Sequence, residues 1–80
     1  IGGEEFACIL PGADLEPARG AAERLIARIG AIDLGVDWSL SASAGVAALA
    51  PGEDAGSLVA RADAALYAAK AAGRGRALAA

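Results

Sequence analysis

The sequence predicts an α/β fold, an α+β sandwich in which a central sheet packs against two main helices. Two observations lead to this prediction. Segments with the alternating pattern of strands are separated by segments with helical periodicity, and glycine or proline stands at the junctions between them. The predicted order of elements is turn, strand, helix, strand, helix and a short final strand.

The first strand is predicted over residues 5–10, where apolar side chains such as Phe6 and Cys8 occupy both alternating faces. A strand of this kind is covered on both sides, so Cys8 is expected to be a small buried residue. Pro11 and Gly12 end the strand.

The first helix is predicted over residues 15–32, with Asp14 as its N-cap and Pro17 tolerated in its first turn. Gly20 lies inside the helix and weakens it by about 1 kcal/mol relative to alanine. The face expected to pack carries apolar residues at three- and four-residue spacing. These are Ala18, Ala21, Ala22, Leu25, Ile26, Ile29 and Ile32.

The second strand is predicted over residues 39–48, with one face made of serine and glycine, including Ser43 and Gly45. A helix or a ligand can approach such a backbone closely, and a close-packed helix is the more frequent reason. Trp38, at the start of this region, is expected at a strand edge or in the core.

The second helix is predicted from an Asp54 cap to about residue 72, and Gly73 is a natural left-handed stop. Its apolar stripe is expected at Leu58, Val59, Ala62, Leu66 and Ala69. Residues 76–80 predict a short final strand.

Composition restricts the classes of function. The formal net charge is −3 and no basic stretch is present, which argues against binding to a nucleic-acid backbone. One cysteine and no histidine exclude disulfide scaffolds and Cys/His zinc sites within this chain. No apolar run approaches the roughly 20 residues that cross a bilayer, so we expect a soluble segment without direct membrane contact. Because Ile1 directly precedes the first turn, we expect a truncated chain.

Residues 2–6 read GGEEF and predict a tight turn that leads into the first strand. Two interpretations remain open for the turn alone. It is an ordinary hairpin turn with solvated glutamates, or its glycine backbone admits a nucleotide while an adjacent carboxylate holds Mg²⁺, a cation that prefers oxygen ligands.

Lys70 and Arg74 are four residues apart, so they share one side of the second helix if the helix continues that far. Together they could hold one phosphate tail. For a bare pair the more frequent explanation is two solvated cations near a helix C-terminus, where the helix dipole favours positive charge.

Three motifs occur in order: GGEEF at residues 2–6, SAGVA at 43–47 and ADAALYAAKAAGR at 62–74. In this order they resemble the signature turn, the S-x-G-x-A strand and the A-D-x-A-L-Y-x-A-K-x-x-G-R helix of the GGDEF family. The resemblance spans nearly the whole chain, residues 1–80, as the C-terminal half of a GGDEF domain. It implies a partial nucleotidyl-cyclase-like fold.

The resemblance also implies roles for individual residues. Gly2 and Gly3 line the GTP site, and Glu4 ligates Mg²⁺ or Mn²⁺ and assists deprotonation of the 3′-hydroxyl, with Glu5 as a weaker metal ligand. Lys70 and Arg74 contact the triphosphate. The other matching positions are assigned to packing or local hydrogen bonds. These are Ser43, Gly45, Asp63, Leu66 and Tyr67.

The family activity implied by the resemblance is diguanylate cyclase. Two domains, each holding one GTP, meet as a homodimer and form cyclic di-GMP and two pyrophosphates in bacterial signalling. The resemblance further implies an upstream sensory or regulatory domain and a cytoplasmic location. If the parent protein is anchored in a membrane, this domain is expected on the cytoplasmic side.

The upstream half of the family domain, with a second metal-binding aspartate and the residues that read guanine, is absent from this sequence. A lone Glu4 gives too few metal ligands, so we expect the isolated chain to have negligible cyclase activity. One alternative is a degenerate GGDEF domain that senses GTP or binds another protein. The other is plain packing by a small α/β domain, which leaves the three ordered motifs as coincidence.

Overall fold

The computed structural model describes residues 8, 10–37 and 40–80 of the 80-residue chain. In this part of the chain the order of elements is α1 (Leu15–Gly30), β1 (Ala44–Val46), α2 (Ala55–Ala71) and β2 (Ala77–Ala79). The arrangement agrees with the predicted α/β fold with two main helices.

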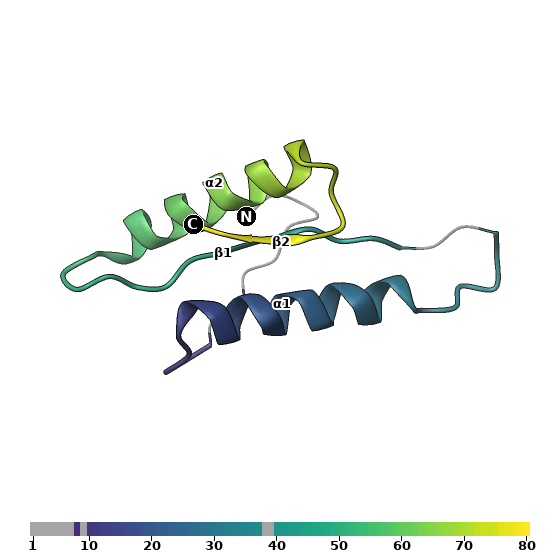
Figure 1. The fold of residues 1–80 in the computed structure, drawn as a ribbon, viewed down its shortest axis with the longest axis horizontal. Helices are drawn as coiled ribbons and strands as arrows, with labels where there is room; N and C mark the ends of the chain where they lie inside the picture. Colours follow the sequence, from purple (N-terminus) through teal and green to yellow (C-terminus); the bar gives the residue numbers. More distant parts are fainter. Residues whose placement is uncertain (1–7, 9, 38–39) are drawn as a thin grey trace.

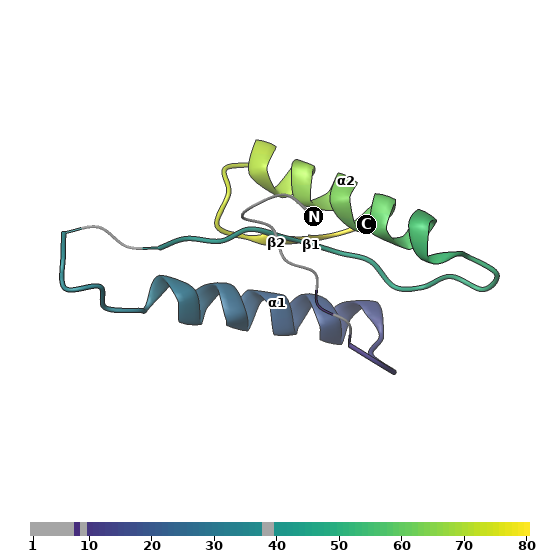
Figure 2. The ribbon, with the colours of Figure 1, turned by 180° about the vertical axis from the view of Figure 1, so that it is seen from behind.

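The two strands are parallel neighbours joined through α2. Ala44 lies opposite Ala77, and Val46 lies opposite Ala79. Both helices contact both strands, and Figure 1 shows α1 and α2 on opposite sides of the sheet. Figure 2 shows the same three layers from behind. Parallel pairing needs a crossover, and here α2 provides it.

Helix α1 begins where the sequence predicts. Asp14 is its N-cap residue, with extended backbone angles, but the Asp14 side chain makes no capping hydrogen bond. The helix ends two residues early, at Gly30, and the Ile32 amide then bonds back to the Ile29 carbonyl at 3.2 Å. Ile32 is 47% exposed, so extending the helix to this residue would gain little stabilisation from tertiary packing.

Helix α1 is tied to the sheet by a side-chain contact as well as by its apolar face. The Glu23 carboxylate accepts a hydrogen bond of 2.9 Å from the backbone amide of Ala77 in β2. The same carboxylate lies 3.7 Å from Arg19 on α1. This contact gives a hydrogen-bond partner to a backbone amide at the edge of the sheet.

Both ends of α2 are capped as the sequence predicts. The Asp54 side chain accepts a hydrogen bond of 2.8 Å from the Ser57 amide, which satisfies one of the free donors of the first turn. At the other end the amides of Gly73 and Arg74 bond to the carbonyls of Lys70 and Ala69, at 3.3 and 3.0 Å. This pair of bonds is the Schellman motif, with Gly73 at a φ of +118°.

Helix α2 lies directly on the backbone of β1 at Gly45. A Cβ atom at this position would collide with the Ala62 carbonyl oxygen and the Leu66 amide nitrogen, and it would lie 2.9 Å from the Ala65 carbonyl carbon. The small face of the strand therefore serves the close approach of a helix, which is the more frequent of the two predicted reasons.

Two strand predictions differ from the structure. The second predicted strand covers 39–48, but within the described residues 40–48 only Ala44–Val46 is strand, because its partner β2 offers just three residues for pairing. Cys8 and Leu10 do not lie in a strand, and the rest of the predicted first strand falls outside the described residues. Cys8 is exposed instead of buried, because no described strand pairs with this segment and covers it.

The buried core of the described residues is small and consists of alanine. Ala65 and Ala69 of α2 and Ala77 of β2 are buried, and the expected packing face of each helix is half-buried at most of its other positions. Leu25 of α1 and Val59 of α2 remain exposed, at 53% and 50%. Each alanine removes little apolar area from water, so backbone-to-backbone contacts such as that of Gly45 carry much of the packing.

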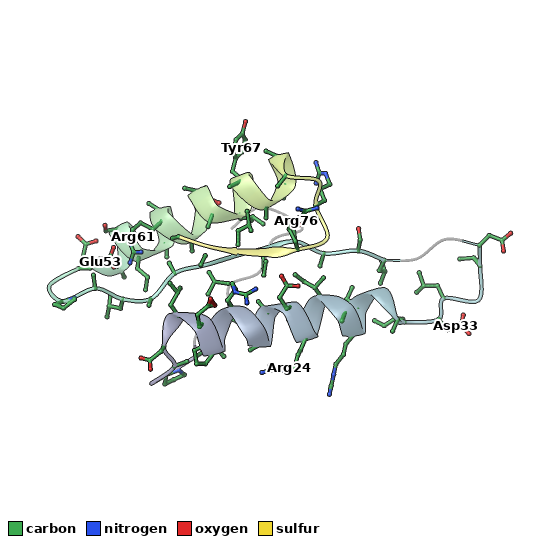
Figure 3. The ribbon with its side chains drawn as sticks, in the orientation of Figure 1. Arg24, Asp33, Glu53, Arg61, Tyr67 and Arg76 are labelled. Carbon is green, nitrogen blue, oxygen red and sulfur yellow. The ribbon has the colours of Figure 1, made fainter. Side chains whose placement is uncertain are left out.

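The loop between β1 and α2 is held by an ion pair. Arg61 donates to both carboxylate oxygens of Glu53, at 2.6 and 2.8 Å, and to the Ala48 carbonyl at 2.5 Å. Figure 3 shows Glu53 and Arg61 side by side at the loop end of α2. The hydrogen bonds from Arg61, and one from the Ala50 amide, lower the pKa of Glu53 to about 2.

Candidate functional site

The predicted signature turn lies outside the described residues. This applies to Gly2, Gly3, Glu4 and Glu5, so their proposed roles in binding GTP and metal stay predictions. Trp38 also lies outside. The structure describes the other half of the candidate site, at the C-terminal end of α2.

Lys70 and Arg74 are placed differently from the prediction. Lys70 lies in the last turn of α2, where the helix dipole favours a cation. Arg74 does not lie on the helix, because α2 ends at Ala71 and the Schellman motif reverses the chain before Arg74. The two residues therefore do not share a helix side.

The backbone of Arg74 has a left-handed conformation. Its φ angle is +63°, and the glycines on either side, Gly73 and Gly75, also have positive φ angles of +118° and +62°. Among the described residues Arg74 is the one non-glycine residue with a positive φ. Non-glycine residues rarely adopt such angles, and residues that do so are enriched at functional sites.

Two hydrogen bonds hold this turn from different directions. The hydroxyl oxygen of Ser43, directly before β1, accepts a bond of 3.0 Å from the Gly75 amide. The Arg76 guanidinium donates a bond of 3.1 Å to the Arg74 carbonyl. Figure 3 shows Arg76 at the turn between α2 and β2. The sequence motifs indicated neither contact, because the Ser43 bond joins residues 32 positions apart and the Arg76 bond depends on the conformation of the turn.

Lys70 and Arg74 line the same open groove despite their different backbone positions. The groove runs between α1, the extended segment that contains β1, and α2. Ser43 and Gly45 of the SAGVA motif line the groove, and so does Asp63. The structure therefore brings both predicted cations to one surface. Lys70 reaches it from the last turn of α2, and Arg74 reaches it from the turn after the helix.

The remaining matching positions have mixed outcomes. Ser43 makes a hydrogen bond and Gly45 makes a packing contact, as expected, and Leu66 is half-buried against the strand. Asp63 is exposed. The packing role expected for Tyr67 is not met within the described residues, because its side chain is 77% exposed and points away from the sheet (Figure 3).

Neither a metal cluster nor a membrane span is found in the described ranges. No group of three histidine, cysteine or acidic side chains in residues 8, 10–37 and 40–80 is placed to hold a metal ion. In the same part of the chain, no helix combines the length and the apolar character needed to cross a membrane.

The β1–α2–β2 unit, with α1 on the other face of the sheet, defines a small α/β domain. Comparison with known proteins identifies the family. The model of the diguanylate cyclase GGDEF domain matches residues 1–76, so this chain belongs to the GGDEF domain family.

A curated relative supports the same family. The chain is 45% identical to Diguanylate cyclase DgcP of Pseudomonas aeruginosa over 79 residues, an alignment that covers 95% of this chain. It spans 12% of the length of that relative. No solved structure gives a significant match.

Proposed function

We propose that this chain supplies the signature turn and the phosphate-binding helix end of a diguanylate cyclase. The complete enzyme joins two GTP molecules into cyclic di-GMP and releases two pyrophosphates. One observation carries the proposal: in a chain of the GGDEF family, Lys70 and Arg74 line one groove, Arg74 from a turn with a left-handed backbone.

Lys70 and Arg74 are proposed to bind the triphosphate of GTP. A guanidinium can make two parallel hydrogen bonds to phosphate oxygens, whereas an ammonium acts as a compact point charge. The backbone of Gly2 and Gly3 is proposed to lie along the nucleotide, since glycine permits close approach. Asp63 in the same groove carries negative charge and would disfavour phosphate at its own position.

The metal ligands are proposed to be Glu4 and, more weakly, Glu5. Their carboxylate oxygens are the donors that Mg²⁺ or Mn²⁺ prefers. When bound, the cation supplies positive charge that stabilises a phosphoryl group under attack. Glu4 is also proposed to accept the proton of the 3′-hydroxyl.

The reaction requires two such domains. We propose a homodimer in which the 3′-oxygen of one GTP forms a bond to the α-phosphorus of the other, and the bond to pyrophosphate breaks. Holding the two nucleotides face to face makes the attack effectively intramolecular, so dimer formation is a natural point of control. An upstream sensory or regulatory domain that governs this step, and a cytoplasmic location, complete the proposal.

The full-length natural protein tests this proposal. It should convert GTP to cyclic di-GMP in the presence of Mg²⁺. Lys70→Ala and Arg74→Ala should each raise the KM for GTP about tenfold or more, because each removes a charged hydrogen bond to phosphate. Product is measured by chromatography over a range of GTP concentrations.

Arg24→Ala is the matched control. Arg24 is an exposed cation on α1 that points away from the sheet (Figure 3), so its removal changes the net charge equally without touching the groove. An unchanged KM in both Lys70→Ala and Arg74→Ala would contradict the proposal. Binding of GTP without any product would favour the degenerate, GTP-sensing alternative instead.

A further inference from the structure

A hydrogen bond from the strand reaches the turn that carries Arg74. Ser43 is the residue directly before β1, and its hydroxyl oxygen accepts a bond of 3.0 Å from the amide of Gly75, 32 positions later in the sequence. Beside it, the Ala44 amide donates to the Arg76 carbonyl at 3.0 Å and begins the pairing of β1 with β2. The Ser43 contact extends the attachment of the turn to the sheet by one more bond.

The turn needs such an attachment because its backbone is strained. A left-handed φ is unfavourable at a non-glycine residue and persists only where surrounding contacts hold it. Arg74 has this conformation between two glycines, which can turn in either direction without a penalty. Without outside contacts, the flanking glycines would let the Arg74 side chain sample several directions.

The contacts that hold the turn have two origins. The bond from the Arg74 amide to Ala69, and the bond from Arg76 to the Arg74 carbonyl, both come from residues next to the turn in sequence. They shape the turn but do not fix its position on the sheet. From the other side of the sheet pairing, the Ser43 hydroxyl, directly before β1, reaches the turn and accepts the Gly75 amide bond. It therefore fixes the turn that carries Arg74 relative to the groove, which Ser43 itself helps to line.

We infer that Ser43 is a positioning residue, which holds the 73–75 turn so that Arg74 points to the phosphate groups of the nucleotide. This inference rests on the proposed function. Ser43 needs no contact with the ligand in this role. Loss of the Ser43 hydroxyl should therefore weaken nucleotide binding by no more than the contribution of Arg74 to that binding. If Ser43 had only a general structural role, its loss would weaken binding whether or not Arg74 is present.

The test is a double-mutant cycle in the full-length natural protein, read out as the Kd of a non-hydrolysable GTP analogue by titration calorimetry. Ser43→Ala should raise the Kd about three- to tenfold, the range of a single uncharged hydrogen bond. In an Arg74→Ala background, the same change should have almost no effect, because the side chain that Ser43 directs is gone. Ser43→Thr keeps a hydroxyl and should bind like the natural protein.

Two comparisons separate positioning from loss of folding. Ser57→Ala removes a serine hydroxyl in the first turn of α2, at the other end of this helix and outside the groove lining, and it should leave the Kd unchanged. If Ser43→Ala fails to fold, Ser43→Thr and Ser43→Val serve instead, since their side chains share a shape and differ in the hydroxyl. The Kd should then rise for valine alone.

The outcomes distinguish this inference from the proposed function. A normal Kd for Arg74→Ala would overturn the proposed role of Arg74 and the inference with it. A raised Kd for Arg74→Ala, together with an equal effect of Ser43→Ala in both backgrounds, would leave the proposed function standing and overturn the positioning role. Equal binding by the threonine and valine variants would also overturn it.

Discussion

At Gly45 the lack of a side chain decides how closely α2 lies on β1. Any larger residue would place its Cβ against backbone atoms of Ala62, Ala65 and Leu66. We expect Gly45→Ala to lower the free energy of unfolding by about 3 kcal/mol, because a packed helix backbone cannot rotate away as a side chain can. Chemical denaturation followed by circular dichroism measures the change.

Gly20 provides the opposite case for comparison. A Cβ at this position of α1 would meet only the end of the Arg24 side chain, at 3.5 Å. Gly20→Ala should therefore raise the free energy of unfolding by up to about 1 kcal/mol, the difference in helix propensity. Equal stability of the two alanine variants would show that the β1–α2 contact is looser than the structure has it.

Residue patterns predicted some of these contacts and missed others. The serine-and-glycine face of the strand predicted over 39–48 indicated a close approach, and Gly45 makes it with α2. The left-handed turn at Arg74 was not predicted, because GRG is compatible with many backbone paths. The bond that connects it to Ser43 joins residues 32 positions apart and follows only from the fold.

At the scale of single elements, the two helices differ in how their first turns are capped. Asp54 accepts a hydrogen bond from the Ser57 amide, whereas Asp14 makes no capping bond although its backbone angles are similar. Asp54→Ala should therefore lower the free energy of unfolding by about 1 kcal/mol, and Asp14→Ala should lower it by less. Thermal or chemical denaturation of both variants checks the order, and the reverse order would contradict it.

The bounds of the helices were predicted well because their signals are local. The caps, the periodic apolar residues and Gly73 all lie within the element or next to it. The strands were predicted less well, since strand length depends on a partner elsewhere in the chain. β1 is limited to Ala44–Val46 by the short β2. Burial of Cys8 likewise requires a partner strand, and Cys8 is exposed.

At the scale of the whole molecule, acid should weaken the folded state through Glu53. Its side chain is 9% exposed and its pKa is lowered from 4.5 to about 2 by Arg61 and the Ala50 amide. A group with a lowered folded-state pKa contributes its full stability above the unfolded-state value. That contribution is lost as the pH falls from about 4.5 toward 2.

The variant Glu53→Gln isolates this contribution, because it removes the titrating group and keeps a similar shape. The free energy of unfolding of the natural chain should fall more steeply between pH 5 and pH 2 than that of the variant, by about one extra bound proton at most. Parallel curves for both proteins across this range would show that the Arg61 contact does not persist in solution.

The family could be predicted from three ordered motifs, and the comparisons confirm it. The candidate site could be predicted only in part. Lys70 and Arg74 line one groove, although they do not share a side of α2, while the signature turn at residues 2–6 lies outside the described part of the chain. Motifs indicate which residues belong to a site, but they carry no information on how a turn directs each side chain.

The parallel crossover makes the length of α2 critical for the site. β1 and β2 run in the same direction, so the last turn of α2 returns to the end of the sheet where Ser43 stands. Inserting one residue into α2 would move its end by about 1.5 Å and rotate it by about 100°. Lys70 would then leave the groove. Insertions in the connection 47–53, at the far end of the sheet, should therefore disturb the site less than insertions within the helix.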